Sequence, residues 1–317
     1  MQHIYLFVVL FFLMMSCACQ QDTQRENNNA RNKQTPVVVV VNYPLEFIVE
    51  FLVGPEIRVI NPVPSGADPE TWLPNDAMIQ TIQESDLIIT NGADFADWVK
   101  KLSLPRSKVL RTSLYLKDSL ITVSDFEVHS HGTKGAHSHA GTVAFFWLDP
   151  ALMIKQAEAV AQKLMVLFPQ EKKTVTVNLK KLKDSLEVLK QKLDQLKTKY
   201  AGLQWFSQRP VYQYLARRTD WSVHHLHWKK HLSPDDNDWK KLKTVQEEHQ
   251  IPFMLWEQKP DEKLVKELQQ RGVASIVFDP LTVKPTQGDY ISEMQRQLNQ
   301  LEQFLTQHSI ALDTSKK

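Results

Sequence analysis

The stretch PVVVVVNYPLEFIVEFLVG, residues 36–54, decides the fold of the chain. Its five consecutive valines form an apolar run with a strong preference for β structure, and no polar residue alternates with them. Such a run is typical of a strand that is covered on both faces in a parallel sheet. After Pro44 the apolar residues take helical spacing, and Gly54 stands where a helix commonly ends. The sequence therefore predicts a buried strand followed by an amphipathic helix.

The same alternation continues along the chain, and it predicts parallel sheets flanked by helices. Further strands are expected at residues 56–63, 86–93, 107–113, 203–207, 222–228, 251–257 and 274–280. Further helices are expected at residues 74–85, 94–102, 147–169, 210–218, 233–249, 261–272 and 289–308. Asp149 is the expected N-cap of the helix in 147–169, and Pro150 is its first residue. Pro210 is expected to open the helix at 210–218.

Residues 174–200 interrupt this alternation with a long helical pattern. Leucines recur at three- and four-residue steps while lysines cover the other positions, and the segment holds no glycine or proline. The leucines are Leu179, Leu182, Leu186, Leu189, Leu193 and Leu196. The composition predicts one long rigid helix packed along two α/β lobes. A coiled coil is the alternative, although the pattern extends over only about three heptads.

The N-terminal residues predict export. Residues 4–15 are all apolar, which is too short for a membrane-spanning helix but suits the core of a signal peptide. Cys17 and Cys19 follow directly and resemble the lipid-attachment cysteine of a bacterial lipobox, and an ordinary cleaved signal is the alternative. The expected organisation is a signal peptide or lipobox at 1–19, a flexible tether at 20–35, an N-terminal lobe at 36–168, a linking helix at 169–203 and a C-terminal lobe at 204–317.

Composition excludes some classes of partner. The chain has 317 residues with a formal net charge of +2, so no strong attraction to nucleic acid or acidic lipid is expected. The only two cysteines stand together behind the apolar N-terminal run, so the folded part has no disulfide framework.

Four of the eleven histidines lie within VHSHGTKGAHSHAG, the histidine-rich loop at residues 128–141. They are His129, His131, His137 and His139. Residues two apart in an extended segment point the same way, and the glycines between the two pairs allow the chain to fold back. Zinc accepts imidazole nitrogen in tetrahedral sets. The pattern is open to three interpretations: ligands of the main metal site, a weak metal-collecting loop, or no metal role. His137 and His139 are the favoured metal ligands, because they lie nearer in sequence to WLDP, residues 147–150.

A second group of histidines, in VHHLHWKKH, is interpreted as a surface feature. It contains His224, His225, His227 and His231. Lys229 and Lys230 lie beside them, and the segment runs into the start of a solvated helix.

The order of motifs over about residues 36–305 resembles the metal-binding receptors of bacterial ABC importers. These are the zinc and manganese solute-binding proteins of cluster A-I, in which two α/β lobes are bridged by a rigid helix. The matching segments are NYPLEFIVEFLVG, VPSGADPETWLP, SDLIITNGADFADWVKKL, the histidine-rich loop, WLDP, RPVYQYLARR, FMLWEQKP and VFDPL. The resemblance implies that a metal ion sits between the lobes, held as a rule by three histidines and one carboxylate.

At the positions that match the family's ligands, the sequence departs from the pattern. Glu70, Phe145 and Arg209 stand where histidine is usual, and only the carboxylate, Asp279 in VFDP, is kept. Asp279 is therefore expected either to bind metal or simply to cap a turn. Glu70 is open to the same two interpretations. Glu257 follows the apolar strand FMLW, and it is expected near the cleft as a ligand or as a hydrogen-bond acceptor behind one.

Arg209 is the most informative departure. A guanidinium about 5 Å from a divalent cation costs roughly 6 kcal/mol at an effective dielectric constant near 20. Three alternatives follow. Arg209 points out of the cleft, or the usual site is not filled in the usual way, or Arg209 pairs with Glu70, Glu257 or Asp279 and takes the place of the cation.

These observations favour a monomeric extracytoplasmic receptor that captures a divalent metal and passes it to an ABC-type permease. It is expected in the periplasm or on the cell surface, held to a bacterial membrane by a lipid anchor. Histidine-rich segments favour Zn²⁺ over Mn²⁺. One alternative is a degenerate receptor that binds a partner or another ligand without tight metal. A zinc-dependent hydrolase is disfavoured, because the chain has no HExxH motif and no serine or cysteine nucleophile motif.

Overall fold

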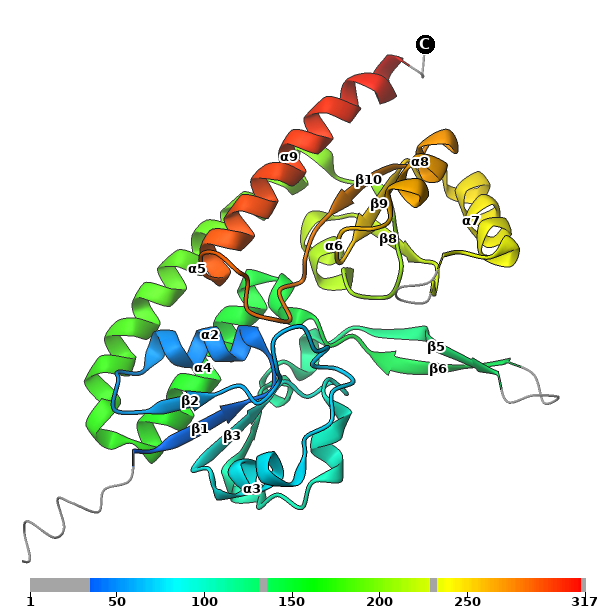
Figure 1. Ribbon diagram of the computed structural model, residues 1–317. Helices are drawn as coiled ribbons and strands as arrows, with labels where there is room; N and C mark the ends of the chain where they lie inside the picture. The colour runs from blue at the N-terminus through cyan, green and yellow to red at the C-terminus, as the bar shows by residue number, and fades with distance from the viewer. Residues whose placement is uncertain (1–34, 131–135, 229–232, 315–317) are drawn as a thin grey trace, which may run out of the picture. The chain divides into compact units, whose positions relative to one another are not determined.

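The structure is a computed structural model, and it describes residues 35–130, 136–228 and 233–314. For residue 97 and residues 124–130, 136–140 and 309–314 it describes the backbone alone. The chain divides into two compact units, residues 1–36 and Val37–Lys317, and the following description concerns the second. This unit contains two α/β lobes, a pair of long helices and a β-hairpin (Figure 1).

The N-terminal lobe contains a parallel sheet with the strand order β2-β1-β3-β4. Its strands are β1 (Val37–Val40), β2 (Arg58–Ile60), β3 (Leu87–Thr90) and β4 (Val109–Arg111). Its helical elements are α2 (Tyr43–Leu52), α3 (Asp76–Glu84), η1 (Asp97–Lys101), η2 (Arg106–Lys108), η3 (Thr112–Tyr115), η4 (Lys117–Ser119), η6 (Phe146–Leu148) and α4 (Pro150–Leu167). The valine run forms β1, one of the two central strands, which explains why it carries no polar residue.

The C-terminal lobe repeats this arrangement. Its parallel sheet has the strand order β10-β9-β7-β8. Its strands are β7 (Gln204–Ser207), β8 (Ser222–His225), β9 (Phe253–Trp256) and β10 (Ala274–Val277), and its helices are α6 (Gln213–Thr219), α7 (Asp236–His249) and α8 (Glu262–Gln270). In each lobe the first and third strands in sequence are therefore neighbours at the centre of the sheet, where the direction of winding changes.

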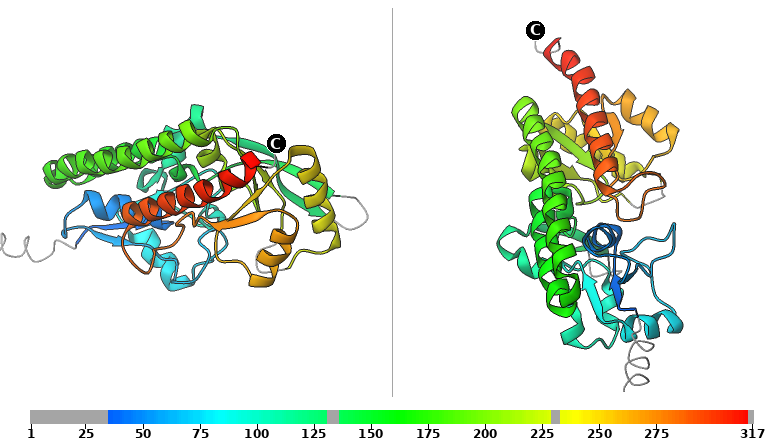
Figure 2. Two further views of the ribbon diagram at one scale, coloured as in Figure 1. Left: turned by 90° about the horizontal axis from the view of Figure 1, so that it is seen from above. Right: turned by 90° about the vertical axis from the view of Figure 1, so that its left-hand side faces the viewer.

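A long helix, α5 (Lys172–Tyr200), follows the short helix η7 (Pro169–Glu171) and contacts both lobes. It packs on α2 and α4 of the N-terminal lobe and on α6 of the C-terminal lobe, and it also packs on α9 (Tyr290–Thr314) (Figure 2). Five of the six stripe leucines are fully buried, and Leu179 is half-buried. Glu302 of α9 accepts bonds from Lys192 at 2.5 Å and Lys199 at 2.8 Å. The expected fold class, two lobes joined by one long helix, is confirmed.

The histidine-rich segment forms an antiparallel hairpin rather than the expected loop. Its strands are β5 (Thr122–Ser130) and β6 (Ala136–Thr142), and the part between them lies outside the described residues. Among the helices of the described part of the chain, none is long and apolar enough to cross a membrane.

Three expected local features were wrong. The helix expected at 94–102 is the short 3-10 helix η1, because Asp94 and Ala96 have left-handed backbone (φ 59° and 58°), which an α-helix does not admit. Helix α6 begins at Gln213, since Pro210 lies in a turn that precedes the helix. Strand β8 ends at His225 rather than continuing to residue 228, and His227 has a positive φ of 58°.

Candidate functional site

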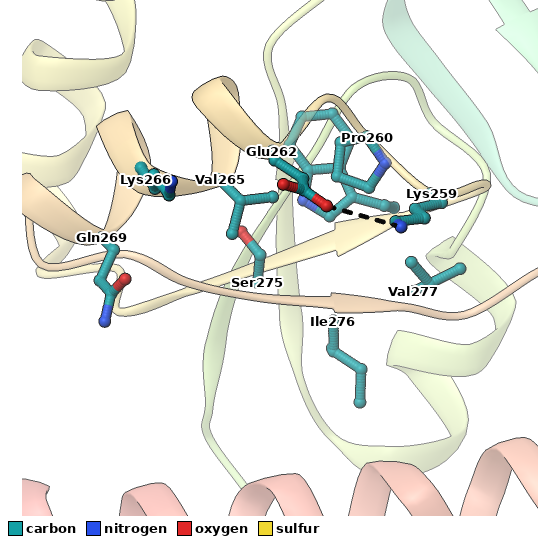
Figure 3. A pocket seen from close by; sticks show the side chains of 10 residues that line it. Lys259, Pro260, Glu262, Val265, Lys266, Gln269, Ser275, Ile276 and Val277 are labelled. Atoms are coloured by element: carbon teal, nitrogen blue, oxygen red, sulfur yellow. Dashed lines mark ion pairs between the residues drawn. The ribbon is translucent and has the colours of Figure 1, made fainter.

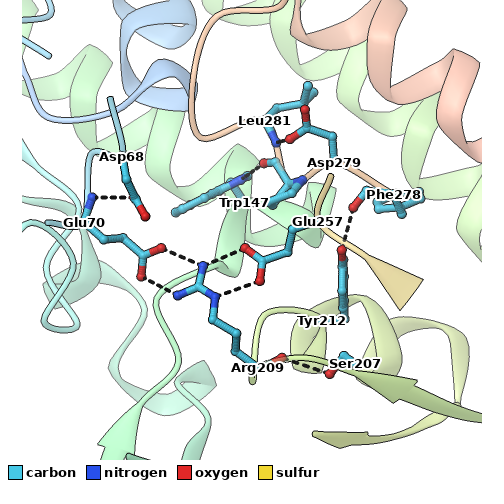
Figure 4. A network of polar contacts seen from close by, with 11 residues as sticks. Asp68, Glu70, Trp147, Ser207, Arg209, Tyr212, Glu257, Phe278, Asp279 and Leu281 are labelled. Carbon is cyan, nitrogen blue, oxygen red and sulfur yellow. Dashed lines mark hydrogen bonds and ion pairs between the residues drawn. The ribbon is translucent and has the colours of Figure 1, made fainter. Parts of the chain in front are cut away.

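Two carboxylates and one guanidinium meet where residues of the two lobes come together. The Arg209 guanidinium donates through Nε and Nη2 to the Glu257 carboxylate at 2.7 and 2.6 Å. It also donates through Nη1 and Nη2 to the Glu70 carboxylate at 3.2 and 2.8 Å. Each carboxylate is therefore bound by two parallel bonds, the geometry for which arginine is suited (Figure 4). We call these three residues the cleft triad.

The sheet of the C-terminal lobe positions two members of the cleft triad. Arg209 follows β7 and Glu257 follows β9, and these strands pair at the centre of the sheet. Both side chains thus leave the carboxyl ends of the strands at the point where the winding reverses, the usual ligand position in such sheets. The Ser207 hydroxyl donates to the Arg209 carbonyl at 2.9 Å and fixes the turn after β7.

A loop of the N-terminal lobe supplies Glu70. The Asp68 carboxylate accepts a bond from the Glu70 amide at 3.0 Å, which closes a local turn. Trp98 donates its indole N–H to the Pro69 carbonyl at 3.3 Å and packs edge-on against Trp72, with ring centroids 5.2 Å apart. These contacts hold the loop so that Glu70 reaches the Arg209 side chain.

The cleft triad is mostly withdrawn from water. Side-chain exposure is 26% for Arg209, 21% for Glu70 and 11% for Glu257. Burial lowers the pKa of Arg209, but the bonds to Glu257 and the charge of Glu70 outweigh it and raise that pKa well above its ordinary value. The guanidinium carbon also lies 5.5 Å from the centre of the buried Phe145 ring. Arg209 is thus a permanent cation inside the cleft, and the triad carries a net charge of −1.

Asp279 lies near the cleft triad without joining it. Its carboxylate accepts the Leu281 amide at 2.7 Å and points toward that residue in Figure 4. Its backbone is held on both sides by Gln297, whose side chain accepts from the Asp279 amide at 2.5 Å and donates to its carbonyl at 3.1 Å. Burial raises the pKa of Asp279, and the Leu281 amide offsets part of the rise.

A small cavity is bordered both by Asp279 and by Glu257 of the cleft triad. Its volume is about 250 Å³, and Asp68, Glu257, Gln258 and Asp279 line it together with apolar and backbone groups. Carboxylates from both lobes therefore border one water-accessible space beside Arg209.

The hairpin brings the other candidate ligands together through its backbone register. His129 pairs with His137, and Glu127 pairs with His139. Paired residues of an antiparallel ladder lie on the same face, as do residues two apart along a strand. The four positions thus share one face of the hairpin. His131 falls outside the described residues, as do Cys17 and Cys19.

Within the residues whose side chains the structure describes, no group of three or more His, Cys, Asp or Glu residues is arranged to hold a metal ion. The second histidine group forms two ring contacts instead. His224 lies against His249 with ring centroids 4.3 Å apart, and His225 lies edge-on to His227 at 4.6 Å. His231 is outside the described residues.

Sequence reasoning missed two residues that shape the site, Asp68 and Gln297. The sequence indicated the role of Asp68, because Asp before Pro favours a turn and its side chain commonly bonds the backbone amide two residues on. Gln297 also carried a signal, since it is a polar residue in register with the apolar face of its helix, between Met294 and Leu298, and it is 2% exposed. A buried amide at such a position has to bond a partner, which here is the backbone of Asp279.

Comparison with known proteins places the chain in a family. A family described as "ZnuA: Zinc-uptake complex component A periplasmic" matches residues 38–304. The chain belongs to this family. Among curated relatives of this ZnuA family, the zinc-binding lipoprotein AdcA of Streptococcus pneumoniae serotype 4 is 24% identical over 294 residues. That match covers 88% of this chain and 58% of AdcA, so the chain spans little more than half the length of this relative.

Solved structures share the fold. The metal-dependent lipoprotein YcdH of Bacillus subtilis superimposes with a TM-score of 0.69 at 20% identity, covering 84% of this chain and 98% of YcdH. The Zn(II)-bound ZnuA-like domain of S. pneumoniae AdcA gives 0.69 at 19% identity, covering 85% and 98%. The Mn²⁺ complex of FpvC from Pseudomonas aeruginosa gives 0.70 at 19% identity, covering 84% and 96%. The resemblance to cluster A-I receptors is thereby confirmed as ZnuA family membership.

Proposed function

We propose that this chain is the extracytoplasmic receptor of an ABC-type importer and that its cargo is Zn²⁺. Its family is one of solute-binding receptors, and relatives with the same fold are named for zinc or for bound metal. The observation that carries the proposal is the hairpin register, which gathers three histidine positions and one glutamate position on one face. Imidazole nitrogens and a carboxylate oxygen are the ligands that zinc prefers outside thiolate sites.

In this proposal the hairpin supplies metal ligands that the cleft lacks. Phe145 is buried and apolar, and Arg209 cannot bind a cation, so two of the four family positions offer no ligand. The carboxylate oxygens of Glu70 and Glu257 already accept hydrogen bonds from Arg209. Zn²⁺ held by His129, His137 and His139, with His131 or Glu127 as the fourth ligand, avoids the repulsion from Arg209. Glu70, Glu257 and Asp279 are the further candidates that enter if the guanidinium moves away.

The cleft triad favours a second candidate function, a receptor that no longer binds metal tightly. Arg209 places a fixed positive charge between two carboxylates, which is what a bound cation would otherwise do. In that case the lobes are held together by an internal ion pair, and the ligand is a partner or another solute. A hydrolase is not proposed, because the family consists of binding proteins.

Anchoring and partners follow from the same proposal. Lipid attached to Cys17 or Cys19 would hold a monomeric receptor at the outer side of the bacterial membrane through the segment 20–35. Zn²⁺ would then pass to an ABC permease in that membrane. Two curated relatives are themselves named lipoproteins.

Zinc titration against a competing chelator separates the two functions. The protein from residue 20 onward is compared with a variant in which His129, His131, His137 and His139 are replaced by Gln, and with one that lacks residues 129–139. We expect tight one-to-one binding in the first and its loss in both others. A matched variant with His224→Gln and His249→Gln should bind as the unaltered protein does.

The remaining outcomes each exclude part of the proposal. If tight binding survives the loss of the hairpin histidines, the carboxylates of the cleft hold the metal and the hairpin only gathers it. If neither the unaltered protein nor the hairpin variants bind zinc tightly, the receptor without tight metal is correct. Arg209→His then gives a further test, because removal of the fixed charge should raise zinc affinity at least about tenfold if the cleft is the metal position.

A further inference from the structure

The strand β10 forms one edge of the C-terminal sheet. Among the residues that the structure describes it pairs with β9 alone. Ala274 and Phe278 donate their amides toward β9, each at 2.8 Å. Hydrogen bonding alternates along a strand, so the amides and carbonyls of Ser275 and Val277 point away from the sheet. Neither residue has a backbone bond to any described part of the chain on that side. The edge is therefore open to another strand.

A cavity of about 420 Å³ lies between this edge and helix α8 (Figure 3). Its lining is mainly apolar and includes Trp256, Pro260, Val265, Ile276 and Val277. Val265 and Val277 belong to neither hydrophobic core of the described residues, and Val277 is 36% exposed. Val277 is thus partly open beside the half-buried Val265, and the two valines give the cavity an apolar wall.

Two residues of the cavity lining each carry a buried polar atom that has no partner among the described residues. The two atoms are the indole N–H of Trp256, a residue only 2% exposed, and the hydroxyl of Ser275. Buried polar groups are as a rule hydrogen-bonded, and leaving one unsatisfied is unfavourable. Both atoms are closed off from solvent, so they mark imperfect packing of the wall rather than groups that an occupant of the cavity can reach.

The rim of the cavity is positively charged. Lys259 and Lys266 line it together with one acidic residue, Glu262. Lys259 lies 3.9 Å from Glu262, and both side chains are about 80% exposed, so this pair is weak. Lys266 has no ion pair within the described part of the chain. The excess of lysine favours an occupant with acidic residues beside its apolar ones.

We propose that an extended segment of a partner protein adds to the free edge of β10 and places an apolar side chain in the cavity against α8. Its backbone bonds Ser275 and Val277, and acidic residues next to the apolar one face Lys259 and Lys266. The mode is strand addition with a side-chain pocket, in which main-chain bonds give affinity and the pocket gives selectivity. The surface involves neither the hairpin nor the cleft triad, so it is independent of zinc.

Hydrogen exchange and peptide binding test the proposal on the protein from residue 20 onward. The probe is a pool of short fluorescent peptides in which alternating apolar residues are flanked by aspartate. We expect binding by fluorescence anisotropy, together with slower exchange of the Ser275 and Val277 amides in the complex. The same pool with N-methylated backbone at alternate residues should not bind, since methylation removes the strand hydrogen bonds.

Four variants separate the contribution of the backbone from that of the lysine charge. Val277→Pro removes an outward amide without touching the ladder to β9, because proline is tolerated on the solvent side of an edge strand. Val277→Thr is its matched control and keeps the amide and the shape. We expect Val277→Pro to weaken binding about tenfold or more and Val277→Thr to weaken it much less. Lys266→Glu should weaken binding severalfold, whereas Lys263→Glu, on the same helix but outside the cavity lining, should not.

Clear results overturn the proposal. If no peptide of the pool binds, or if binding leaves the exchange of Ser275 and Val277 unchanged, strand addition at β10 is wrong. If the N-methylated pool binds equally well, the cavity binds an apolar group with a neighbouring carboxylate, and no strand is added to β10. If a lysine-flanked pool binds as well as the aspartate-flanked one, the charge preference is wrong. Circular dichroism of each variant excludes loss of folding as the cause.

Discussion

The two lobes have the same strand order but end their central strands in different chemistry. In the N-terminal lobe β1 and β3 lead into Asn42 and Asn91, both fully buried. The Asn42 side chain caps α2, and the Asn91 amide donates to the Ala144 carbonyl at 2.9 Å. In the C-terminal lobe the equivalent strands lead into the charged Arg209 and Glu257. The residues after the central strands thus stabilise the lobe itself in the N-terminal lobe. In the C-terminal lobe they carry charge toward the other lobe.

The difference shows how unequal the lobes' contributions to the cleft are. Only Glu70 of the N-terminal lobe joins the triad, and it comes from a loop rather than from the end of a central strand. Its bonds to Arg209, at 2.8 and 3.2 Å, are longer than those of Glu257, at 2.6 and 2.7 Å. The triad is therefore centred on the C-terminal lobe, and Glu70 is the link by which the other lobe is held.

Removal of the central charge should have the largest effect on stability. Arg209→Met leaves two mostly buried carboxylates facing each other without a cation. Breaking a fully buried pair costs about 3–5 kcal/mol, and the partial exposure of these side chains reduces our expectation to about 2–3 kcal/mol. Urea unfolding of the variant measures the loss. Lys183→Met, which breaks the exposed pair with Glu158, is the control and should cost under about 0.5 kcal/mol. Equal losses of unfolding free energy in Arg209→Met and Lys183→Met would mean that the triad adds nothing to stability.

Most of the fold could be predicted because it depends on local patterns. The valine run, the leucine stripe and the Asp-Pro helix start each carry their own signal, and each lies where the sequence placed it. The wrong features depend on backbone conformation that residue type does not dictate. Asp94 and Ala96 adopt left-handed backbone although neither is glycine. Tertiary contacts must stabilise such residues, and one sequence does not reveal them.

The candidate site was only partly predictable for a related reason. Glu70, Arg209 and Glu257 are far apart in sequence, and the resemblance to a family brought them to one place. That resemblance left three alternatives for Arg209, and the distances show the ion-paired arrangement. Whether Arg209 replaces a cation in function, and which residues bind zinc, stay predictions. The hairpin register could not be foreseen, since glycine-bearing turns fit several registers.

The two carboxylates of the triad should differ in importance. Glu257→Gln removes charge from the less exposed carboxylate, which makes the shorter bonds. Glu70→Gln removes it from the more exposed one. We expect Glu257→Gln to lower the free energy of unfolding by about 1.5–2 kcal/mol and Glu70→Gln to lower it by about 1 kcal/mol or less. Double-mutant cycles with Arg209→Met, followed by urea unfolding, give the two coupling energies. If the coupling to Glu70 equals or exceeds that to Glu257, the triad is not centred on the C-terminal lobe.

The smallest expected effect concerns two aspartates that form the same kind of local turn, one in each half of the chain. Asp149 and Asp279 each precede proline, and each accepts the amide two residues later, at 3.0 and 2.7 Å. Burial raises the pKa of both carboxyls. The folded state therefore holds each proton to a higher pH than the unfolded state does. Each protonated carboxyl's contribution to the stability of the fold is fully present below the unfolded pKa, near 3.8. It is lost as pH rises through the raised pKa of the folded state.

Replacement by Asn removes this titration while keeping the oxygen that accepts the amide. Asp149→Asn and Asp279→Asn should each be as stable as the unaltered protein or up to about 1 kcal/mol more stable at pH 7. The gain should shrink as pH falls toward 4, which urea unfolding at several pH values measures. If both variants behave alike in stability and only Asp279→Asn lowers zinc affinity, Asp279 is a metal ligand as well as a turn former. If neither changes zinc affinity, the Asp279 carboxylate serves the turn alone, as that of Asp149 does.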